Sequence, residues 1–421
     1  MLLSKKFSSD LVWNFFSLGI LAISGIVINI FIAKYYGSIH LGVFNQVFAI
    51  YILLSQLAIG GIHFSTLKHI SYNQNKISIV GEITISALIL SIAISLPISV
   101  ITYLIKDFIG DLFGSPSVGF GLILIAPGLI FFSINKILFN VLNGLNLMRT
   151  YAIYQACRYI FIMFAIIGIY NLSYPGMFLS ISLTFAEALL TILLLSHLCY
   201  SVIPIKKLII KKSWFFKHID FGFKGFLSGA LSELNTRIDV LTIGYFMSDA
   251  MVGVYSFAAI IAEGIGQLSI VVRRNIDPLI GDSFSRNNFL EIELYSKKIK
   301  RTFPFLIFGV CLLIGLLYPF ILEILIGSGD FNLSFFVLVI LMSGVVLNSI
   351  YRPFLGILLQ GNKPGHHTIL VLIMILVNLI GNIALIPIFG IYGAAIATAF
   401  AYVLEGILIK FFSYRYLNVK I

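Results

Sequence analysis

The sequence predicts an all-α integral membrane protein with twelve transmembrane helices, and three observations support this fold class. Of the 421 residues, 59% are hydrophobic and only 11% are charged, whereas a soluble domain has about 25% charged residues. Apolar stretches of about 20 residues, the length that crosses a bilayer as a helix, recur along the whole chain. Lysines and arginines gather in alternate connections between these stretches. Because twelve spans leave only short connections and tails, no sizeable soluble domain is expected.

The predicted spans form two groups of six, separated by a lysine-rich break near the middle of the chain. The first six cover residues 11–34, 41–62, 79–104, 119–142, 150–170 and 175–199. The second six cover residues 223–246, 252–275, 303–325, 333–358, 367–388 and 392–413. The break alternates paired lysines with large apolar residues, a pattern typical of a segment lying at the membrane surface. We therefore predict an N-terminal lobe (1–200), a cytoplasmic amphipathic linker (201–221) and a C-terminal lobe (222–421).

The distribution of positive charge predicts the orientation of the chain. Alternate connections, together with both tails, hold 21 of the 28 lysines and arginines, whereas the opposite connections hold only Lys34 and Lys106. Since positively charged loops stay on the cytoplasmic side, both termini are expected to be cytoplasmic. The net charge of +11 is mostly this orientation signal. No basic patch accompanies a soluble module, so a nucleic-acid partner is not expected.

The two halves of the chain show an internal repeat. With a shift of 211 residues, 41–44 (LGVF) align with 252–255 (VGVY). With a shift of 217, 142–144 (LNG) align with 359–361 (LQG). Because each copy has an even number of spans, both copies face the same way across the membrane. This predicts two six-helix lobes related by a pseudo-two-fold axis along the membrane normal, with a cavity between them.

Parts of the second half resemble the seventh and eighth spans of polysaccharide-repeat flippases. The matching stretches are 235–239 (NTRID), 243–246 (IGYF) and 252–256 (VGVYS). Residues 277–280 (DPLI), followed by a charged helix, are similar to the next loop of that family. These O-antigen and capsule flippases share a superfamily with multidrug and toxin extruders and lipid II flippases. The resemblance covers the whole chain in topology and about 50 residues in pattern.

The resemblance implies a function in polysaccharide assembly. Such a protein translocates undecaprenyl-diphosphate-linked oligosaccharide repeat units from the inner to the outer leaflet, by alternating access with ion coupling. The implied location is the bacterial cytoplasmic (inner) membrane. The translocated repeat units are used in the assembly of O-antigen, capsule or exopolysaccharide. The implied partners are the lipid-linked oligosaccharide, membrane lipids, and the polysaccharide polymerase with its chain-length machinery.

Four cations within the predicted spans are candidates for binding the diphosphate: Lys136, Arg158, Arg237 and Arg352. A lipid diphosphate cannot cross lipid unaided, because its charge and its sugars would lose water together. A cationic, water-filled cavity removes that cost. An alternative stays open for each cation. Lys136, Arg158 and Arg352 lie within snorkelling distance of the cytoplasmic helix ends, and Arg237 can pair with Glu233, four residues earlier, to fix helix packing.

Three acidic residues within the spans are candidates for ion coupling. Glu233 and Asp239 lie in the seventh span and Glu263 lies in the eighth. Asp239 is two residues from Arg237, so the two side chains leave the helix in different directions. Glu263 has no cation near it in sequence, which predicts either a protonated carboxyl or a pair with a cation on another helix. A carboxylate that takes a proton can compete with an anion for an arginine.

Aromatic residues on the repeat-related second and eighth spans are candidates for stacking against sugar rings: Phe44, Tyr51 and Tyr255. No metal or cofactor is expected. The three cysteines are far apart in sequence, and none has the Cys/Cys or Cys/His spacing of a metal site.

Other functions fit the sequence less well. A multidrug and toxin extrusion-type cation antiporter of the same fold is the alternative, but it would favour an acidic cavity. A lipid II flippase has two more spans, and a major-facilitator carrier has a Gly- and Arg-rich turn between its second and third spans. A glycosyltransferase or polymerase needs a large outer loop, and the longest outer loop here is 105–118. Without a P-loop, HExxH or GxSxG pattern in a fitting context, an enzyme is not expected.

Overall fold

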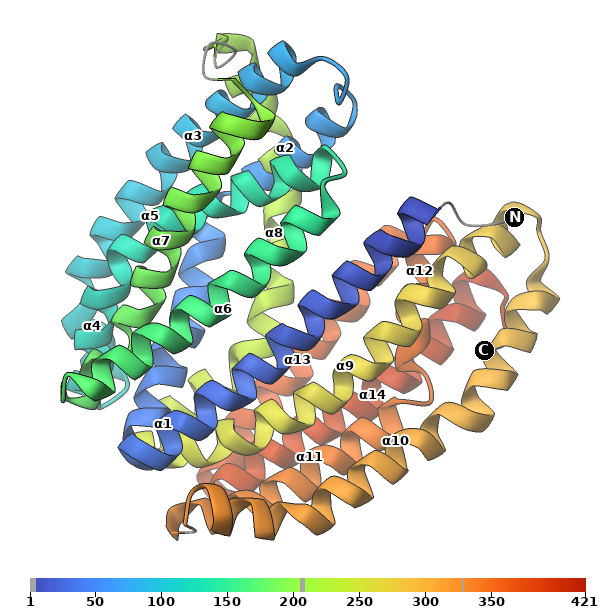
Figure 1. Ribbon diagram of the computed structural model, residues 1–421. Coiled ribbons are helices and arrows are strands. Elements are labelled where there is room, and N and C mark those ends of the chain that lie inside the picture. The colour runs from blue at the N-terminus through green and yellow to red at the C-terminus, as the bar shows by residue number, and fades with distance from the viewer. Residues whose placement is uncertain (1–4, 205–208, 328) are drawn as a thin grey trace. The chain divides into compact units, whose positions relative to one another are not determined.

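The computed structural model describes residues 5–204, 209–327 and 329–421, and within these ranges the chain folds into helices with no strand (Figure 1). Ten of these helices are long and apolar enough to cross a membrane. An all-helical membrane protein is therefore confirmed. Residues 205–208 of the predicted linker, with Lys206 and Lys207, lie outside the described ranges.

The difference between ten and twelve candidate spans has two sources. The first two predicted spans are joined in one helix, α1 (Lys5–Ile59), which is interrupted by a non-helical residue at Gly37. The seventh predicted span lies in α8 (Lys212–Phe246), whose charged residues make it less apolar than the helices that count as candidate spans. The total of twelve spans, the pseudo-two-fold axis and the cytoplasmic termini stay predictions.

The chain divides into two compact units. Unit 1 comprises the chain up to Phe31 together with Val43–Glu233, and unit 2 comprises Ile32–Gly42 and Leu234–Ile421. Both α1 and α8 contribute to the two units. The lobe boundaries at residues 200 and 222 stay a prediction.

Unit 1 is built around α5. Besides its parts of α1 and α8, unit 1 contains α2 (Ile62–Ser71), α3 (Ile77–Leu104), α4 (Lys106–Leu112), α5 (Pro116–Gly144), α6 (Met148–Asn171), η1 (Gly176–Phe178), α7 (Ile181–His197) and η2 (Leu198–Val202). Helix α5 contacts α2, α3, α4, α6 and α7. Ile137, Leu138 and Leu142 of α5 pack with Ile83 of α3 and Leu190 of α7 in a fully buried core. This central position explains why α5 carries residues that reach several neighbouring helices.

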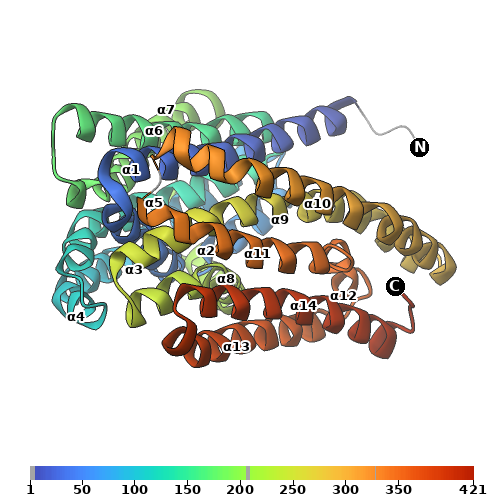
Figure 2. The same cartoon turned by 90° about the horizontal axis from the view of Figure 1, so that it is seen from below.

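Unit 2 is organised around α11 and α14. Besides its parts of α1 and α8, unit 2 contains α9 (Asp249–Ser285), α10 (Phe289–Leu325), η4 (Gly329–Leu333), α11 (Ser334–Asn348), η5 (Arg352–Phe354), α12 (Ile357–Gln360), α13 (Pro364–Phe389) and α14 (Ile391–Leu417). Helix α14 contacts both α11 and α13, and α11 also contacts α9 and α10. Figure 2 shows α13 and α14 running side by side. A buried core includes Phe354, Ile357, Leu370 and Ile409.

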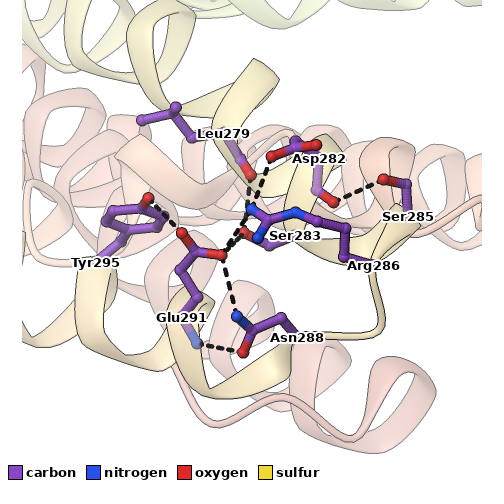
Figure 3. Close-up of polar contacts among 8 residues, drawn as sticks. All are labelled: Leu279, Asp282, Ser283, Ser285, Arg286, Asn288, Glu291 and Tyr295. Atoms are coloured by element: carbon purple, nitrogen blue, oxygen red, sulfur yellow. Dashed lines mark hydrogen bonds and ion pairs between the residues drawn. The ribbon is translucent and has the colours of Figure 1, made fainter. Parts of the chain in front are cut away.

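The turn between α9 and α10 is fixed by polar contacts centred on Glu291 (Figure 3). The Glu291 carboxylate accepts hydrogen bonds from Arg286 Nη2 at 2.9 Å and from the Tyr295 hydroxyl at 2.9 Å. It also accepts one from the Ser283 hydroxyl at 3.0 Å. Arg286 Nη2 contacts Asp282 at 2.7 Å. The charges of this segment thus stabilise the junction of two long helices.

The described part of the predicted linker folds onto α2 and α3 of unit 1. The Trp214 indole N–H donates to Glu82 Oε2 at 3.2 Å, and Lys211 Nζ lies 2.6 Å from Glu82 Oε1. His218 is fully buried. Its Nδ1 lies 2.9 Å from the Ser65 hydroxyl and its Nε2 lies 3.2 Å from the Ile83 carbonyl oxygen. These contacts anchor the start of α8.

A close backbone contact joins two repeat-related segments within unit 2. A Cβ atom at Gly42 would overlap the carbonyl oxygen of Asp249, and a Cβ atom at Gly253 would overlap that of Ser38. The repeat shift of 211 residues relates Gly42 to Gly253 and Ser38 to Asp249. The contact is therefore reciprocal, and it requires small residues on both sides, as close helix packing in membranes does.

We predict that Gly253→Ala destabilises the protein by about 1–3 kcal/mol, because the added methyl group forces the backbones apart. The matched control is Gly266→Ala on the same helix, where no atom lies within 4 Å of an added Cβ. Alanine at that open helical position should stabilise by up to about 1 kcal/mol. Thermal unfolding in detergent measures both changes. Equal effects of the two substitutions would contradict the packing assignment.

The burial of His218 predicts a pH dependence of stability. Burial lowers the pKa of His218 from 6.5 to about 4, so the folded state disfavours its protonation. The stabilising contribution is complete above pH 6.5 and is lost as the pH falls toward 4; it is on the order of 3 kcal/mol. Tryptophan fluorescence should show His218→Gln unfolding with a flatter dependence on pH over this range than the wild type. An unchanged dependence would argue against this role for His218.

Candidate functional site

Each unit contains a polar cavity. The unit 1 cavity has a volume of about 410 Å³. Its polar lining residues are Gln56, His63, Lys136, Asn140, Tyr151, Gln155, Arg158 and Glu233, with Phe64 and Phe139 beside them. Two of the four predicted cations, Lys136 on α5 and Arg158 on α6, thus line one cavity. Amide and hydroxyl groups surround them.

Arg158 is held inside unit 1 by a carboxylate that the sequence analysis did not select. Its Nε lies 2.8 Å from Glu187 Oε1, and its Nη2 donates to Glu187 Oε2 at 3.3 Å. The guanidinium carbon lies 5.4 Å from the ring centroid of Phe132 and 5.2 Å from that of Phe139. Only 13% of the Arg158 side chain is exposed. Arg158 is therefore held in one orientation at the wall of the unit 1 cavity.

Lys136 and His63 complete the basic part of the unit 1 cavity. Lys136 lies within electrostatic range of Arg158, Glu233 and Glu187. His63 is only 5% exposed, and its Nδ1 has no hydrogen-bond partner among the described residues. An unsatisfied buried nitrogen at a polar cavity is suited to bind a water molecule or a polar ligand group.

The unit 2 cavity is smaller, about 160 Å³, and is more acidic. Asp239, Glu263 and Glu405 line it together with Arg352. Three predicted site residues, Asp239, Glu263 and Arg352, are thus brought together by α8, α9 and η5.

Asp239 accepts four hydrogen bonds from three other helices. The amide groups of Asn378 and Asn382 on α13 each donate to its Oδ1 at 2.8 Å. The hydroxyl groups of Tyr255 on α9 and Thr398 on α14 donate to its Oδ2 at 3.0 and 2.8 Å. Four donors satisfy the acceptor capacity of an ionised carboxylate. Asp239 is thereby a fixed connection between α8 and the helices around it.

Arg352 is paired with Glu405 in unit 2. Its Nη1 lies 2.5 Å from Glu405 Oε2, and the same oxygen accepts from the Asn348 amide at 2.6 Å. The guanidinium carbon lies 5.8 Å from the Tyr402 ring centroid. The Arg352 side chain is 27% exposed, so its charged group borders the cavity and is not fully enclosed.

The predicted pairing of Glu233 with Arg237 stays a prediction. Glu233 lines the unit 1 cavity, whereas Arg237 belongs to unit 2 and lies within electrostatic range of Glu263. Within the described ranges, no group of three or more His, Cys, Asp or Glu side chains could hold a metal ion.

The predicted sugar-stacking residues are buried in helix packing. Phe44, Tyr51 and Tyr255 are 5%, 2% and 1% exposed. Phe44 stacks on Phe48, the Tyr51 hydroxyl donates to the Gly128 carbonyl at 3.3 Å, and the Tyr255 hydroxyl donates to Asp239. Among the described residues that line the two cavities, none of the three occurs. Their contact with sugars stays a prediction that requires movement of the surrounding helices.

The repeat contained a signal for two missed acidic residues and their amide partners. Asn135 and Asn348 are 213 residues apart, and Glu187 and Glu405 are 218 apart, close to the repeat shifts of 211 and 217. A search for polar residues at these separations within spans would have selected both pairs.

Comparison with known proteins gives a family match and a set of similar folds. The family described as polysaccharide biosynthesis protein matches residues 9–272. A probable low-salt glycan biosynthesis flippase of Haloferax volcanii is 30% identical over 187 residues, which are 44% of this chain and 39% of that protein. The present chain thus matches well under half of that relative's length.

Two solved structures share the fold over most of the chain. The lipid II flippase MurJ in an inward closed conformation has a TM-score of 0.77 at 19% identity, covering 96% of this chain and 86% of that chain. An inward-facing multidrug resistance MATE family transporter has a TM-score of 0.73 at 15% identity, covering 91% of this chain and 92% of that chain. At these identities the likeness concerns the fold alone.

We predict that Asp239→Asn destabilises unit 2, because the asparagine amide group cannot accept all four hydrogen bonds. At least one buried donor is then left unpaired, at a cost of about 1–3 kcal/mol. Thermal unfolding in detergent measures the change. Asp111→Asn, at an exposed position on α4, is the matched control and should stay within about 0.5 kcal/mol of the wild type. Equal stability of the two variants would contradict the role of Asp239 as a connection between helices.

Proposed function

Because this chain belongs to the polysaccharide biosynthesis protein family, we propose that it is a flippase for lipid-linked glycans. Its substrate is an undecaprenyl-diphosphate-linked oligosaccharide repeat unit, carried by alternating access from the inner to the outer leaflet of the bacterial cytoplasmic membrane. The products serve O-antigen, capsule or exopolysaccharide assembly, with the polymerase and chain-length machinery as partners. The similarity to a probable glycan biosynthesis flippase supports this role.

The single observation that carries the proposal is the unit 1 cavity. Lys136 and Arg158 reach it from two helices, and Gln56, Asn140 and Gln155 supply neutral polar groups around them. A diphosphate needs replacement of its water shell by charge-assisted hydrogen bonds before it can enter a membrane. Amide groups beside the cations can meet the first sugar hydroxyls. The cavity therefore offers both of the interactions that the polar part of this substrate requires.

Both cations have carboxylate neighbours, which lower the affinity of the cavity for other anions. Arg158 contacts Glu187, and Lys136 lies near Glu233. Phosphate groups must compete with these carboxylates to bind. Such competition suits a transporter. Without it the substrate would bind more tightly, and tighter binding mostly means slower dissociation.

Ion coupling is assigned to Asp239, with Glu263 beside it in unit 2 and Glu233 in unit 1. The Asp239 carboxylate joins α8 to α9, α13 and α14 through four hydrogen bonds. A proton or a monovalent cation bound there neutralises the carboxylate. The hydrogen bonds that the carboxylate accepts from its four donors then become weaker. Coupling-ion binding thus changes the contacts of α8, the helix that also carries Arg237.

A second candidate function is cation antiport of the multidrug and toxin extrusion type. The observation that favours it is the acidic lining of the unit 2 cavity by Asp239, Glu263 and Glu405. A hydrophobic cation would be attracted to such carboxylates. The cations of unit 1 favour the flippase.

The test uses purified protein in liposomes with a fluorescent short-chain polyprenyl-diphosphate-linked disaccharide, whose movement between leaflets is read by chemical quenching. We expect Lys136→Gln and Arg237→Ala to lower the flipping rate by about 10- to 100-fold. This is the range for loss of one charge-assisted interaction of about 1.5–3 kcal/mol.

Lys298→Gln, which removes an exposed cation on α10, is the matched control and should stay within about twofold of the wild type. Equal rates for all variants would reject the cationic site. Transport of a fluorescent organic cation, without movement of the lipid, would favour the antiporter.

A further inference from the structure

The same three residue types form a buried cluster in each unit. The unit 1 triad consists of Asn135 on α5, Arg158 on α6 and Glu187 on α7. The unit 2 triad consists of Asn348 on α11, Arg352 on η5 and Glu405 on α14. In both triads the carboxylate contacts the arginine and accepts from the asparagine amide.

The distances within the two triads are similar. Asn135 Nδ2 donates to Glu187 Oε2 at 2.7 Å, and Asn348 Nδ2 donates to Glu405 Oε2 at 2.6 Å. The glutamate side chains are 4% and 7% exposed. The asparagines and glutamates recur at separations close to the repeat shifts, whereas the arginines come from elements that do not correspond, α6 and η5. In each unit an asparagine amide donates to a glutamate, and that glutamate pairs with an arginine. The arginine comes from a different structural element in each unit.

Stability alone is a weak explanation for these pairs. A buried ion pair is often no more stabilising than well-packed apolar residues of similar size, because both charges lose their water. A role that uses the charges accounts better for their presence in both units. The position of the arginines indicates which role this is.

Both arginines contact a buried carboxylate and also line a cavity. Arg158 lines the unit 1 cavity, and Arg352 lines the unit 2 cavity. A guanidinium has five N–H groups. Glu187 accepts a hydrogen bond from Nη2 of Arg158, and Glu405 accepts one from Nη1 of Arg352. The remaining N–H groups have no protein acceptor among the described residues. They are placed to meet an anion in the cavity before the glutamate is released.

We propose that Glu187 and Glu405 are positioning residues that hold Arg158 and Arg352 in neutral pairs and release them to the phosphates of the substrate. The inference rests on the proposed function and deepens it. Phosphate oxygens accept from a guanidinium in the same forked geometry as a carboxylate. The exchange therefore replaces one anion by another, and the arginine is never buried without a partner.

The exchange also determines what happens to the glutamate. A buried carboxylate that loses its arginine is strongly destabilised unless it becomes neutral. The carboxylate takes up one proton, which the buffered solution supplies through the water in the cavity, so that an O–H bond forms and the buffer loses that proton. The carboxyl group keeps its hydrogen bond from the asparagine amide. Binding of a lipid diphosphate is thus linked to uptake of a proton at each triad that exchanges.

The unit 2 triad is the easier one to open. The Asn135 amide oxygen accepts from the Thr191 hydroxyl at 2.9 Å. By contrast, the Asn348 amide oxygen is buried and has no partner among the described residues. The Arg352 side chain is also more exposed than that of Arg158, 27% against 13%. We therefore expect Glu405 to release its arginine more readily than Glu187 does.

The test measures binding of geranylgeranyl diphosphate to the full chain in detergent by titration calorimetry, in two buffers of different ionisation enthalpy. The proton uptake follows from the difference between the buffers. Glu405→Gln and Glu187→Gln keep the side-chain shape but remove the competing charge. Each should tighten binding by about 10-fold, equal to 1.4 kcal/mol, and should lower proton uptake. Glu82→Gln, which removes another buried carboxylate paired with a cation, is the matched control and should change neither quantity.

A charge exchange separates positioning from structural support. Arg158→Glu combined with Glu187→Arg keeps an ion pair but moves the cation away from its place at the cavity. A purely structural role predicts restored flipping in liposomes, and that result would overturn the inference. We expect a folded protein whose flipping stays at least about 10-fold below the wild type.

The outcomes also separate this inference from the proposed function. Wild-type protein that binds and flips the lipid diphosphate, with unchanged affinity and proton uptake in both glutamine variants, would reject the exchange alone. Wild-type protein that neither binds nor flips the lipid would reject both. The two glutamine variants are read independently, so a folding failure of one leaves the other as the test.

Discussion

The cost of placing charge inside apolar helices is the constraint on which the rest of this structure depends. Lipid offers no hydrogen bonds, so an ionisable side chain at membrane depth needs partners from the protein or from a water-filled cavity. Glu187, Asp239 and Glu405 all satisfy this need through side chains from other helices. Their polar clusters lie beside the two cavities, so the same contacts both stabilise the helices and shape the candidate site.

The two units meet this constraint with different balances of charge. The unit 1 cavity brings Lys136 together with Arg158, whereas the unit 2 cavity brings Asp239 and Glu263 together with Glu405. This difference suits a division of tasks in which unit 1 offers the anionic head group two cations, whereas unit 2 offers it Arg352 and also binds the coupling ion. The proposed exchange of arginines between carboxylate and phosphate connects the two tasks, because each release leaves a carboxylate that needs a proton.

Sequence patterns predicted the fold class and selected many candidate residues, because charge within long apolar stretches is conspicuous. Lys136, Arg158 and Arg352 were selected in this way, and all three line cavities. Their partners were not identified. Glu187 and Arg158 are 29 residues apart and Arg352 and Glu405 are 53 apart, and such a pairing depends on how the helices are rotated against each other. Hydropathy contains no information on that rotation.

The sequence by itself therefore determined that the chain is a helical membrane protein with an internal repeat and with ionisable groups inside its helices. Apolar length and charge are local properties, which can be read from each segment alone. Only the tertiary structure decided that Tyr255 donates to Asp239 within the helix packing, and that Glu187 and Glu405 hold the two arginines. These contacts join residues from different helices, and the direction of each side chain is set by the packing of whole helices against one another.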